Sequence, residues 1–487
     1  MSFRRLVTTL TFLAVFAMAT RVSTDTDTWW HLRAGAWITE HRQILASDPF
    51  SLTRFGEPWV YPGWLSQITL YAVFRLAGYA GLNLLTAGTV VVAFAFVWRV
   101  MEAPPLLRSA VLLLAVTASG VYWSARPQIF SLMLSGIFVW ALERWRCGHR
   151  WSVWLLPVLM AIWSNLHGGF ALGLILMAAY LAGTAADIGL RRLTQGAAAS
   201  TGADRDLRRL IVLAGVLVLS VLAICANPHG PSMLLYPFKT VSINVLQRYI
   251  QEWQSPDFHR LEAQPFLWMF LLTLAAFAAA PGHVGTTDFL LVAGLGYLSF
   301  MAGRNIAIFA LACAPALSRY LHLAMVPLLA RVKMGREVSP RIARVVNIGL
   351  GFLAALGVVI KISSPLSVSV NEEALKEQIP VDAVAYLREN NPEGPLLNSY
   401  NWGGYVLWAL YPRYRSFVDG RTDLFDDELL TEYLHAWRAD PGWEDILEKW
   451  EIKLVLLEPE APLSLALEWQ GWKQLFADGQ AVVLAKP

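Results

Sequence analysis

Residues 6–33 read LVTTLTFLAVFAMATRVSTDTDTWWHLR, an apolar run followed at once by two carboxylates and a pair of tryptophans. The run Leu6–Ala19 follows Arg4 and Arg5. It is long enough to predict a transmembrane helix that begins on the cytoplasmic side and ends on the outer side. Ala17-Met18-Ala19 would also suit signal-peptide cleavage. The many apolar runs that follow favour an uncleaved first helix, which places the acidic stretch at the membrane exit.

The composition of the whole chain indicates a polytopic membrane protein. It has 487 residues, of which 56% are hydrophobic and 15% charged, whereas soluble domains carry about 25% charged residues. The net charge of +3 is small, so it bears on membrane topology and does not indicate a nucleic-acid partner. Cys147, Cys225 and Cys313 show no CxxC spacing, which argues against a disulfide framework or a thiolate metal site.

Clusters of Lys and Arg predict which ends of the spans face the cytoplasm. Four clusters, at 99–108, 144–150, 191–209 and 331–344, are assigned to the inside together with the N-terminus. With the C-terminus outside, we predict about eleven transmembrane helices, at 6–20, 82–99, 106–123, 128–143, 151–164, 169–187, 210–226, 264–280, 287–302, 305–328 and 346–362.

The first external loop, 21–62, and the segment after it are predicted to hold helices that lie along the outer membrane interface. Thr28–His41 repeats apolar residues at helical spacing on one side, as an interfacial amphipathic helix does. The apolar segment 63–77 is short and carries Gln67 and Arg75, so we predict that it lies in the interface and does not span.

After residue 362 the chain becomes richer in charge and alternates helical and strand patterns. We therefore predict two domains, a transmembrane domain over 1–362 and an extracytoplasmic mixed α/β domain over 363–487. Within the second, the predicted helices cover 373–391, 402–410 and 427–450, and the predicted strands cover 395–398, 416–419, 453–458 and 481–485.

Polar residues that interrupt the apolar spans fall mostly on the predicted outer side. They occur in the segments 126–128, 165–169, 227–230 and 304–305 and in the external loop 227–262. Each alone suits a turn or a snorkelling side chain, but their shared side favours one cavity. Arginine offers bidentate contacts to phosphate, so the candidates for binding a donor phosphate are Arg33, Arg126, His167, Lys239, Arg248 and Arg304.

Asp25 and Asp27 are the candidate catalytic residues, and the sequence leaves their division of labour open. Asp27 suits the N-cap of the helix that begins near Thr28, which would leave Asp25 free to react. Sugar transfer with inversion needs a carboxylate that deprotonates the acceptor, and cations that stabilise the phosphate leaving group. The pair could instead hold one divalent cation, Mg²⁺ or Mn²⁺, while His31 orients the reactants.

These features together resemble the GT-C superfamily of glycosyltransferases that use lipid-phosphate sugars, such as protein O-mannosyltransferases, the aminoarabinose transferase of lipid A and oligosaccharyltransferase catalytic subunits. The resemblance rests on the acidic motif after the first span, the long first loop, the span number and the external C-terminal domain. It implies a general base or metal ligand at Asp25 or Asp27, basic residues that bind a polyprenyl phosphate, and a location in the bacterial cytoplasmic membrane.

The C-terminal stretches 399–405 (SYNWGGY) and 417–421 (FVDGR) are similar to the Trp-Trp-Asp region with which oligosaccharyltransferases recognise their acceptor. The aspartate of that region is absent here, which argues against asparagine-linked glycosylation. Trp402 and Tyr405 could bind an acceptor or pack this domain on the membrane body. The remaining candidates for acceptor binding or orientation are His31, Asp48, His229 and Glu252.

The sequence therefore predicts a membrane hexosyl- or pentosyltransferase. It would move a sugar from a polyprenyl-phosphate or pyrophosphate donor to an extracytoplasmic glycan, lipid or protein, among membrane lipids. A transporter or flippase of lipid-linked sugars is a second hypothesis, because helices broken by polar residues also suit transport. A non-catalytic scaffold for envelope assembly is a third, and the carboxylate pair argues against it.

Overall fold

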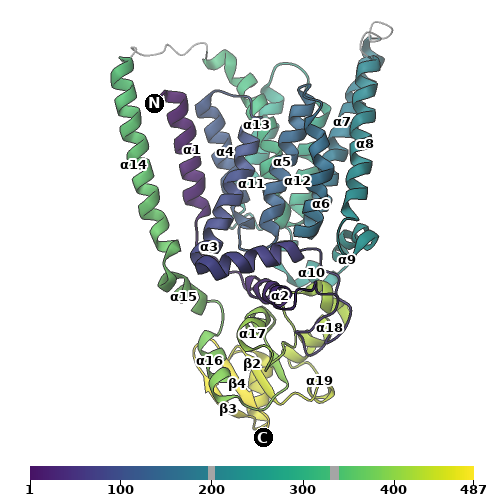
Figure 1. The fold of residues 1–487 in the computed structure, drawn as a ribbon, viewed down its shortest axis with the longest axis vertical. Coiled ribbons are helices and arrows are strands. Elements are labelled where there is room, and N and C mark those ends of the chain that lie inside the picture. Colours follow the sequence, from purple (N-terminus) through teal and green to yellow (C-terminus); the bar gives the residue numbers. More distant parts are fainter. Residues whose placement is uncertain (196–202, 330–338) are drawn as a thin grey trace.

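The apolar runs form a bundle of helices in the computed structural model, which describes residues 1–195, 203–329 and 339–487 (Figure 1). Each of the eleven predicted spans falls on one of these helices. The bundle consists of α1 (Phe3–Ala19), α3 (Trp64–Trp98), α4 (Pro105–Ser119), α5 (Gln128–Arg146), α6 (Leu156–Leu166), α7 (Ala171–Gln195), α8 (Ala203–Ile224), α11 (Gln264–Ala279), α12 (Thr286–Met301), α13 (Ile306–Leu329) and α14 (Pro340–Leu366).

Among the described residues, six helices are long and apolar enough to cross a membrane. The shorter apolar helices include α11 and α12, so the number of eleven spans stays a prediction. Parts of two predicted basic clusters, in 196–202 and 330–338, lie outside the described residues. Figure 1 places the N-terminus at one end of the bundle and the C-terminal part of the chain at the other.

α3 changes direction at Gly78, and this break positions the outer end of the bundle. Gly78 has φ 56° and ψ −143°, a backbone conformation that glycine adopts far more easily than other residues. Figure 1 shows the first part of α3 lying across the ends of the other helices before the second part enters the bundle. The predicted interfacial helix at 63–77 and the predicted span at 82–99 are thus two arms of one element.

α2 (Thr28–His41) has the bounds that the sequence predicts, but it is buried more completely than an interfacial helix. Trp29 and Leu32 pack into a core shared with α3 and the C-terminal part of the chain. Trp30 and Ile38 pack into a second core on the other side. The sequence predicted that α2 has one apolar face and one face exposed to solvent. In the structure a second hydrophobic core covers that other face, so both sides of the helix are buried.

The C-terminal unit, 367–487, is built on a sheet of four strands with the order β1-β2-β4-β3. β1 and β2 are parallel, whereas β4 pairs antiparallel with both β2 and β3. The elements are α15 (Val368–Lys376), α16 (Val381–Asn390), β1 (Leu396–Asn398), α17 (Gly403–Leu410), α18 (Thr422–Trp437), α19 (Trp443–Lys449), β2 (Leu454–Leu457), α20 (Pro462–Trp469), β3 (Lys473–Ala477) and β4 (Val482–Ala485). The predicted domain boundary at 362 falls inside α14.

Three predictions for the C-terminal unit need correction. The predicted helix 373–391 is divided into α15 and α16, because a helix is interrupted before Pro380. The predicted helix 427–450 is divided near Gly442, which has φ 89°. The predicted strand 416–419 makes only an isolated bridge, from Ser416 to Ser51 of the first loop, and β3 was not predicted at all.

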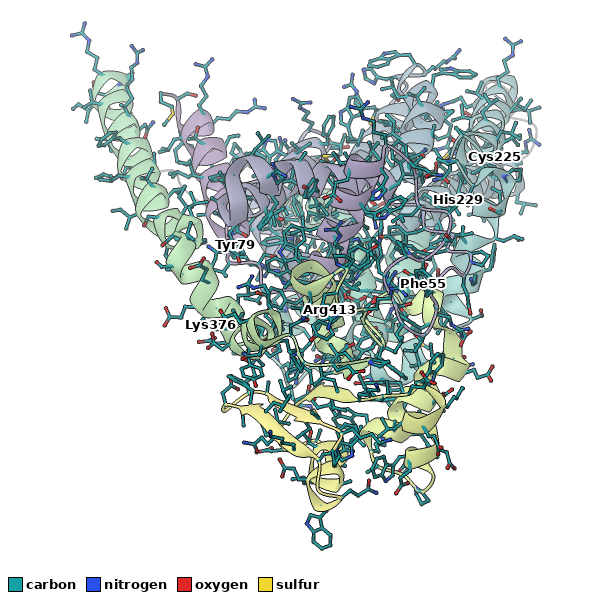
Figure 2. All side chains as sticks on the ribbon, turned by 60° about the horizontal axis from the view of Figure 1, so that its bottom comes forward. Phe55, Tyr79, Cys225, His229, Lys376 and Arg413 are labelled. Atoms are coloured by element: carbon teal, nitrogen blue, oxygen red, sulfur yellow. The ribbon has the colours of Figure 1, made fainter. Side chains whose placement is uncertain are left out.

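The first external loop is attached to the C-terminal unit by hydrogen bonds and ion pairs. Thr53 donates its hydroxyl to the Phe417 carbonyl oxygen at 2.7 Å, and an Arg54 nitrogen lies 2.6 Å from an Asp426 oxygen. Phe55, labelled in Figure 2, lies beneath the Arg415 guanidinium at 3.5 Å from the ring centroid. The loop and the C-terminal unit therefore pack as one body against the end of the bundle.

Candidate active site

A cavity of about 1390 Å³ lies where the bundle meets the C-terminal unit. The acidic loop before α2 and the segment before α5 form part of its wall. The external segment with α9 (Tyr236–Val241), α10 (Asn244–Tyr249) and the turn Gln251–Trp253 forms another part. The C-terminal unit closes the remaining side. The polar segments 126–128, 165–169 and 304–305 thus contribute residues to one space, whereas the segment 227–230 does not.

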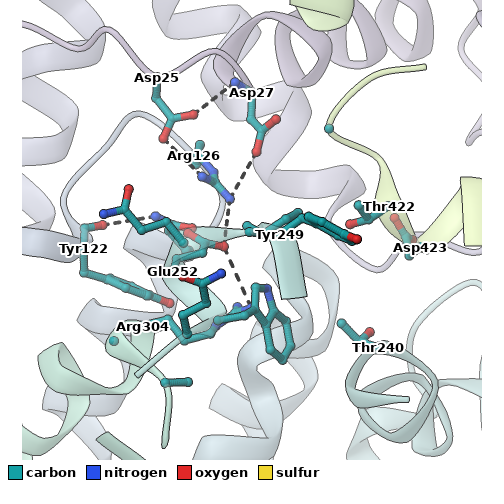
Figure 3. Close-up of a pocket in the computed structure, with 18 of the residues that line it drawn as sticks. Asp25, Asp27, Tyr122, Arg126, Thr240, Tyr249, Glu252, Arg304, Thr422 and Asp423 are labelled. Atoms are coloured by element: carbon teal, nitrogen blue, oxygen red, sulfur yellow. Dashed lines mark hydrogen bonds and ion pairs between the residues drawn. The ribbon is translucent and has the colours of Figure 1, made fainter. Parts of the chain in front are cut away.

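Arg126 lies at the centre of the cavity, between three carboxylates (Figure 3). Its guanidinium nitrogens lie 3.2 Å from an Asp25 oxygen, 3.2 Å from an Asp27 oxygen and 3.6 Å from a Glu252 oxygen. Arg304 stands behind Glu252 at 3.9 Å and lies over the Trp253 ring at 4.1 Å. Five of the predicted site residues, from segments far apart in the sequence, therefore form one charge cluster.

Asp25 and Asp27 differ in their hydrogen bonds, and this difference bears on the division of labour that the sequence left open. Asp25 Oδ1 accepts a hydrogen bond from the Asp27 backbone N–H at 3.0 Å, and so it shapes the loop that leads into α2. Asp27 occupies the N-cap position of α2, yet its side chain makes no capping hydrogen bond. The carboxyl group of Asp27 therefore remains available to the cavity.

Burial raises the pKa of Asp27 to about 7, against the opposing effect of Arg126; Asp25 and Glu252 add to the increase. The Asp27 side chain keeps 22% of its surface exposed and lines the cavity. For Glu252, burial also favours the neutral form, but Arg126 and Arg304 together lower its pKa. Of these two carboxyl groups, Asp27 is the one poised to exchange a proton near neutral pH.

His31 and His167 line the cavity as neutral side chains. Burial lowers the pKa of His167 to about 3, and the neighbouring Arg304 and Arg126 lower it further. Its Nδ1 accepts a hydrogen bond from the Gly169 N–H at 3.1 Å, which places the ring proton on Nε2. Burial likewise lowers the pKa of His31 well below its usual range. His167 can donate a hydrogen bond to a phosphate, but it does not bring a positive charge.

The structure separates several other predicted residues from the cavity. Arg33 pairs with Glu40 at 2.9 Å, away from the cavity lining. Lys239 is an exposed residue of α9, and His229 is half-buried in the preceding turn without reaching the lining. The side chain of Arg248 lies outside the described residues.

Asp48, Trp402 and Tyr405 have structural partners in place of cavity contacts. Asp48 is completely buried and pairs with Arg421, so it joins the first loop to the C-terminal unit. Trp402 is 4% exposed within a hydrophobic core, and Tyr405 makes an edge contact with Trp29 at 5.1 Å. Packing of the C-terminal unit on the membrane body therefore accounts for the two aromatic side chains.

Sequence reasoning missed Asp423, which lines the cavity from the first turn of α18. Burial raises the pKa of Asp423, and the Tyr236 hydroxyl donates to its Oδ2 at 3.4 Å. It also missed Tyr61 and Tyr400, which line the cavity too. The signal for Asp423 is its place two residues after the FVDGR motif, just beyond the predicted strand 416–419.

Two glycines, Gly420 and Gly404, allow the C-terminal unit to approach the acidic loop, and Gly403 allows two segments of that unit to pack closely. A Cβ atom on Gly420 would lie 1.7 Å from Asp27 Oδ1, and one on Gly404 would lie 2.8 Å from the Thr26 carbonyl oxygen. A Cβ atom on Gly403 would lie 2.1 Å from the Val418 carbonyl oxygen. Because glycine has no side chain, the backbone of the SYNWGGY and FVDGR stretches can lie close to the loop that carries Asp27.

The carboxylates of the cavity do not form a ready-made metal site. Among the described residues, no group of three or more His, Cys, Asp or Glu side chains could hold a metal ion. Asp25, Asp27 and Glu252 all face the Arg126 guanidinium, which takes the central place that a cation would need. The divalent cation stays a prediction, and no step proposed below depends on it.

No protein-family model matches the sequence, and no curated protein does. Solved structures are similar in fold. The archaeal oligosaccharyltransferase AglB from Archaeoglobus fulgidus, in complex with an inhibitory peptide and a dolichol-phosphate, is 13% identical over 94% of this chain and 70% of its own, with a TM-score of 0.53. The apo form of the A. fulgidus oligosaccharyltransferase is 12% identical over 93% of this chain and 70% of its own, with a TM-score of 0.54.

ArnT from Cupriavidus metallidurans, bound to undecaprenyl phosphate, aligns with 97% of this chain and 96% of its own at 12% identity. Its TM-score of 0.47 is too low to support a conclusion. The two oligosaccharyltransferase structures establish similarity of fold at an identity that does not transfer substrate or activity. The chain therefore shares the fold of these two oligosaccharyltransferase structures, a group that its sequence was found to resemble.

Proposed function

We propose that this chain transfers a sugar from a polyprenyl-phosphate or polyprenyl-pyrophosphate donor to an acceptor on the outer side of the bacterial cytoplasmic membrane. The observation that carries the proposal is the pairing of Asp27 with Arg126 in a large cavity beside the apolar bundle. The carboxyl group has a pKa of about 7 and the guanidinium is permanently charged, so one site offers a base and a phosphate ligand.

The residues of the cavity account for each part of such a transfer. Ionised Asp27 takes the proton of an acceptor hydroxyl while the hydroxyl oxygen forms its bond to the anomeric carbon. The bond from that carbon to the phosphate oxygen breaks, and its electron pair stays on the polyprenyl phosphate. Arg126 and Arg304 stabilise the negative charge that appears there. Asp27 then releases the proton to water, and the site is ready for another donor.

Asp25 and Glu252 act on the position of the reacting groups. Asp25 fixes the Asp27 backbone and contributes one of the ion pairs that hold Arg126. Glu252 lies between Arg126 and Arg304 and holds the two cations on one side of the cavity. A donor phosphate would bind the guanidinium groups of Arg126 and Arg304 together. We therefore expect it to replace part of the ion pairing that Asp25 and Glu252 provide in its absence.

The test is donor turnover by the purified full-length protein in nanodiscs, with a panel of undecaprenyl-phosphate-linked sugars and the release of undecaprenyl phosphate as the signal. Asp27→Asn should reduce turnover by about 10²- to 10⁴-fold, the share of general base catalysis. The double variant Asp25→Asn/Asp27→Asn should fold and show no transfer. Asp382→Asn, at an aspartate that is 61% exposed in the C-terminal unit, is the matched control.

Full activity of the double variant would refute the proposal. Movement of lipid-linked sugar across a proteoliposome membrane without any release of undecaprenyl phosphate would identify a transporter. Absence of both activities with every donor of the panel would favour a scaffold.

A further inference from the structure

The charges of the cavity are divided between two walls. The membrane wall, from the bundle and the external segment, holds Arg126 and Arg304 at its centre. The C-terminal wall, formed by residues 399–458, contributes Asp423 and Glu458 and, among its described lining residues, neither Lys nor Arg. Figure 3 shows Asp423 to one side of the Arg126 cluster, and its Oδ2 accepts a hydrogen bond from the hydroxyl of Tyr236 in the external segment at 3.4 Å. The cations among the described lining residues therefore lie on the membrane wall, together with carboxylates such as Asp27 and Glu252, whereas the charged groups of the C-terminal wall are carboxyl groups alone.

The parallel pairing of β1 and β2 explains why the C-terminal wall is polar at this point. The carboxyl ends of parallel neighbouring strands lie at the same edge of a sheet, where ligands of α/β folds commonly bind. Ser399–Asn401 follows β1, and Glu458 follows β2. The Ser399 hydroxyl donates to Glu458 Oε1 at 2.6 Å, so the two strand ends are joined by a hydrogen bond.

Aromatic rings surround this edge. Trp437 Nε1 lies 3.5 Å from Glu458 Oε2, and the Tyr433 hydroxyl accepts a hydrogen bond from the Tyr400 N–H at 2.9 Å. All four side chains line the cavity. Asn401 lines it as well and is exposed, so its amide is open to a ligand.

This combination suits one class of acceptor. The C–H face of a sugar ring can pack on an aromatic ring, while its hydroxyl groups donate to carboxylates and exchange hydrogen bonds with an amide. The carboxyl groups Asp423 and Glu458 would repel a uronate or a phosphate but accept an amine. Trp402, in the stretch that resembles an acceptor-recognising region, is buried in the core and offers a peptide nothing to bind.

We infer that the C-terminal wall is the acceptor subsite and takes a carbohydrate that is neutral or carries an amino group. The inference rests on the proposed function only in that it calls this ligand the acceptor. The carbohydrate stacks on Trp437, its hydroxyls bind Glu458 and Asn401, and its reactive hydroxyl extends across the cavity toward Asp27.

Binding of oligosaccharides to the full-length protein in nanodiscs tests this subsite without requiring catalysis. The probes are four sets: neutral hexose oligosaccharides, oligosaccharides with free amino groups, uronic-acid oligosaccharides and a hydroxyl-rich peptide. Each oligosaccharide is offered free and on a lipid anchor. We expect binding of the first two sets, and a loss of at least about tenfold in affinity for Trp437→Ala and for Glu458→Gln.

The matched controls lie in the same unit but away from the cavity. Trp469→Ala, at a tryptophan that is 95% exposed, and Glu460→Gln, at an exposed glutamate, should leave binding unchanged. Trp437→Phe keeps an aromatic ring and should retain most of the affinity, which separates loss of stacking from loss of the fold. Unfolding temperatures of all variants accompany the measurement.

The outcomes distinguish this inference from the proposed function. Preference for uronic acids or for the peptide, or wild-type binding by both Trp437→Ala and Glu458→Gln, would overturn the acceptor subsite even if donor turnover is found. Carbohydrate binding that persists in Asp27→Asn, which lacks the base, supports the subsite whether or not turnover is found. Binding of the lipid-anchored forms alone supports it too and makes the acceptor a glycolipid.

Discussion

At the scale of single residues, one hydrogen bond separates the roles of Asp25 and Asp27. Asp25 accepts the backbone N–H that opens the turn into α2, which commits one of its oxygens to the loop. Asp27 has no such bond, and burial keeps part of its population protonated near neutral pH. In the proposed mechanism, the same stretch of sequence therefore supplies both the base and the group that positions it.

The raised pKa of Asp27 predicts how activity depends on pH. Because its pKa in the folded protein is about 7, above the usual value of 3.8, Asp27 is protonated and inactive as a base below that pH. We expect kcat/KM to rise with pH through about 7 and then level off. A pH series with the donor of the turnover assay measures it. Asp27→Asn should remove this rise from its residual activity, and a wild-type profile that is flat from pH 5 to 9 would contradict the assignment.

The central place of Arg126 predicts that transfer does not require a divalent cation. Its guanidinium faces all three carboxylates and supplies the positive charge that a metal would bring to the phosphate. We expect turnover in excess EDTA to lie within about twofold of turnover with Mg²⁺ or Mn²⁺. Arg126→Gln should reduce turnover by about 100-fold or more, as loss of one electrostatic donor does. Loss of wild-type activity in EDTA, restored by Mg²⁺, would contradict this role.

The sequence identifies the residues of the cavity that stand where helices are broken, and it misses those whose partners are distant. Arg126, Glu252 and Arg304 could be predicted because charges at a membrane edge need a cavity or a partner. Asp48 could not be separated from them, since its partner Arg421 lies in another part of the chain. Asp423 lies between the predicted strand 416–419 and the predicted helix 427–450, where nothing local marks it as a residue of the cavity.

At the scale of elements, the segment around Gly420 controls the distance between the C-terminal unit and Asp27. Gly420→Ala would place a methyl group 1.7 Å from Asp27 Oδ1, so either the carboxyl group or the backbone must move. We expect a loss of about tenfold to 100-fold in turnover, as displacements of about 1 Å cause, together with a smaller change in unfolding temperature.

Gly479→Ala is the control for this substitution. Gly479 belongs to the same unit, and a Cβ atom there would meet nothing within 4 Å. It should retain wild-type turnover. If Gly420→Ala keeps full turnover as well, the close approach has no part in catalysis.

The sequence predicted helices and strands correctly where the hydrophobic periodicity is strong. It failed where contacts between distant segments determine the local structure. The long apolar runs and the helix 28–41 follow directly from hydrophobic spacing. Segment 416–419 has the composition of a strand, but its backbone meets the first loop and does not join the sheet. β3 is largely exposed, so it lacks the alternation that marks a half-buried strand.

At the scale of the whole molecule, a buried ion pair holds the first loop to the C-terminal unit. Arg421 is completely buried, binds Asp48, and also donates to both oxygens of Asp419, at 2.8 and 2.7 Å. Arg421→Met would leave two carboxylates buried without their cation, which typically costs about 3–5 kcal/mol.

We therefore expect Arg421→Met to lower the unfolding temperature markedly and to expose the junction to proteolysis. Thermal unfolding in nanodiscs and limited proteolysis measure both effects. Arg413→Met, at an exposed arginine of the same unit, should change neither. Equal stability of the two variants would show that the apolar cores alone hold the unit in place.

The sequence could predict that a C-terminal unit follows the last span, because composition changes there. It could not predict that the two sides of α2 complete the cores of that unit. A contact of this kind leaves no local signal: Trp29 and Trp30 suit a membrane interface as well as a protein interior. The transmembrane and C-terminal regions differ in composition, but residues of both regions pack into the same hydrophobic cores.

The approach of Gly420 to Asp27 also bears on the order of events during synthesis. Asp27 leaves the ribosome roughly 390 residues before Gly420, and at about 5–20 residues per second the interval is roughly 20–80 s. Throughout this time the nascent chain carries its carboxylate without the wall that closes the cavity. A truncated or stalled chain that reaches the membrane therefore lacks the C-terminal wall and never completes the cavity.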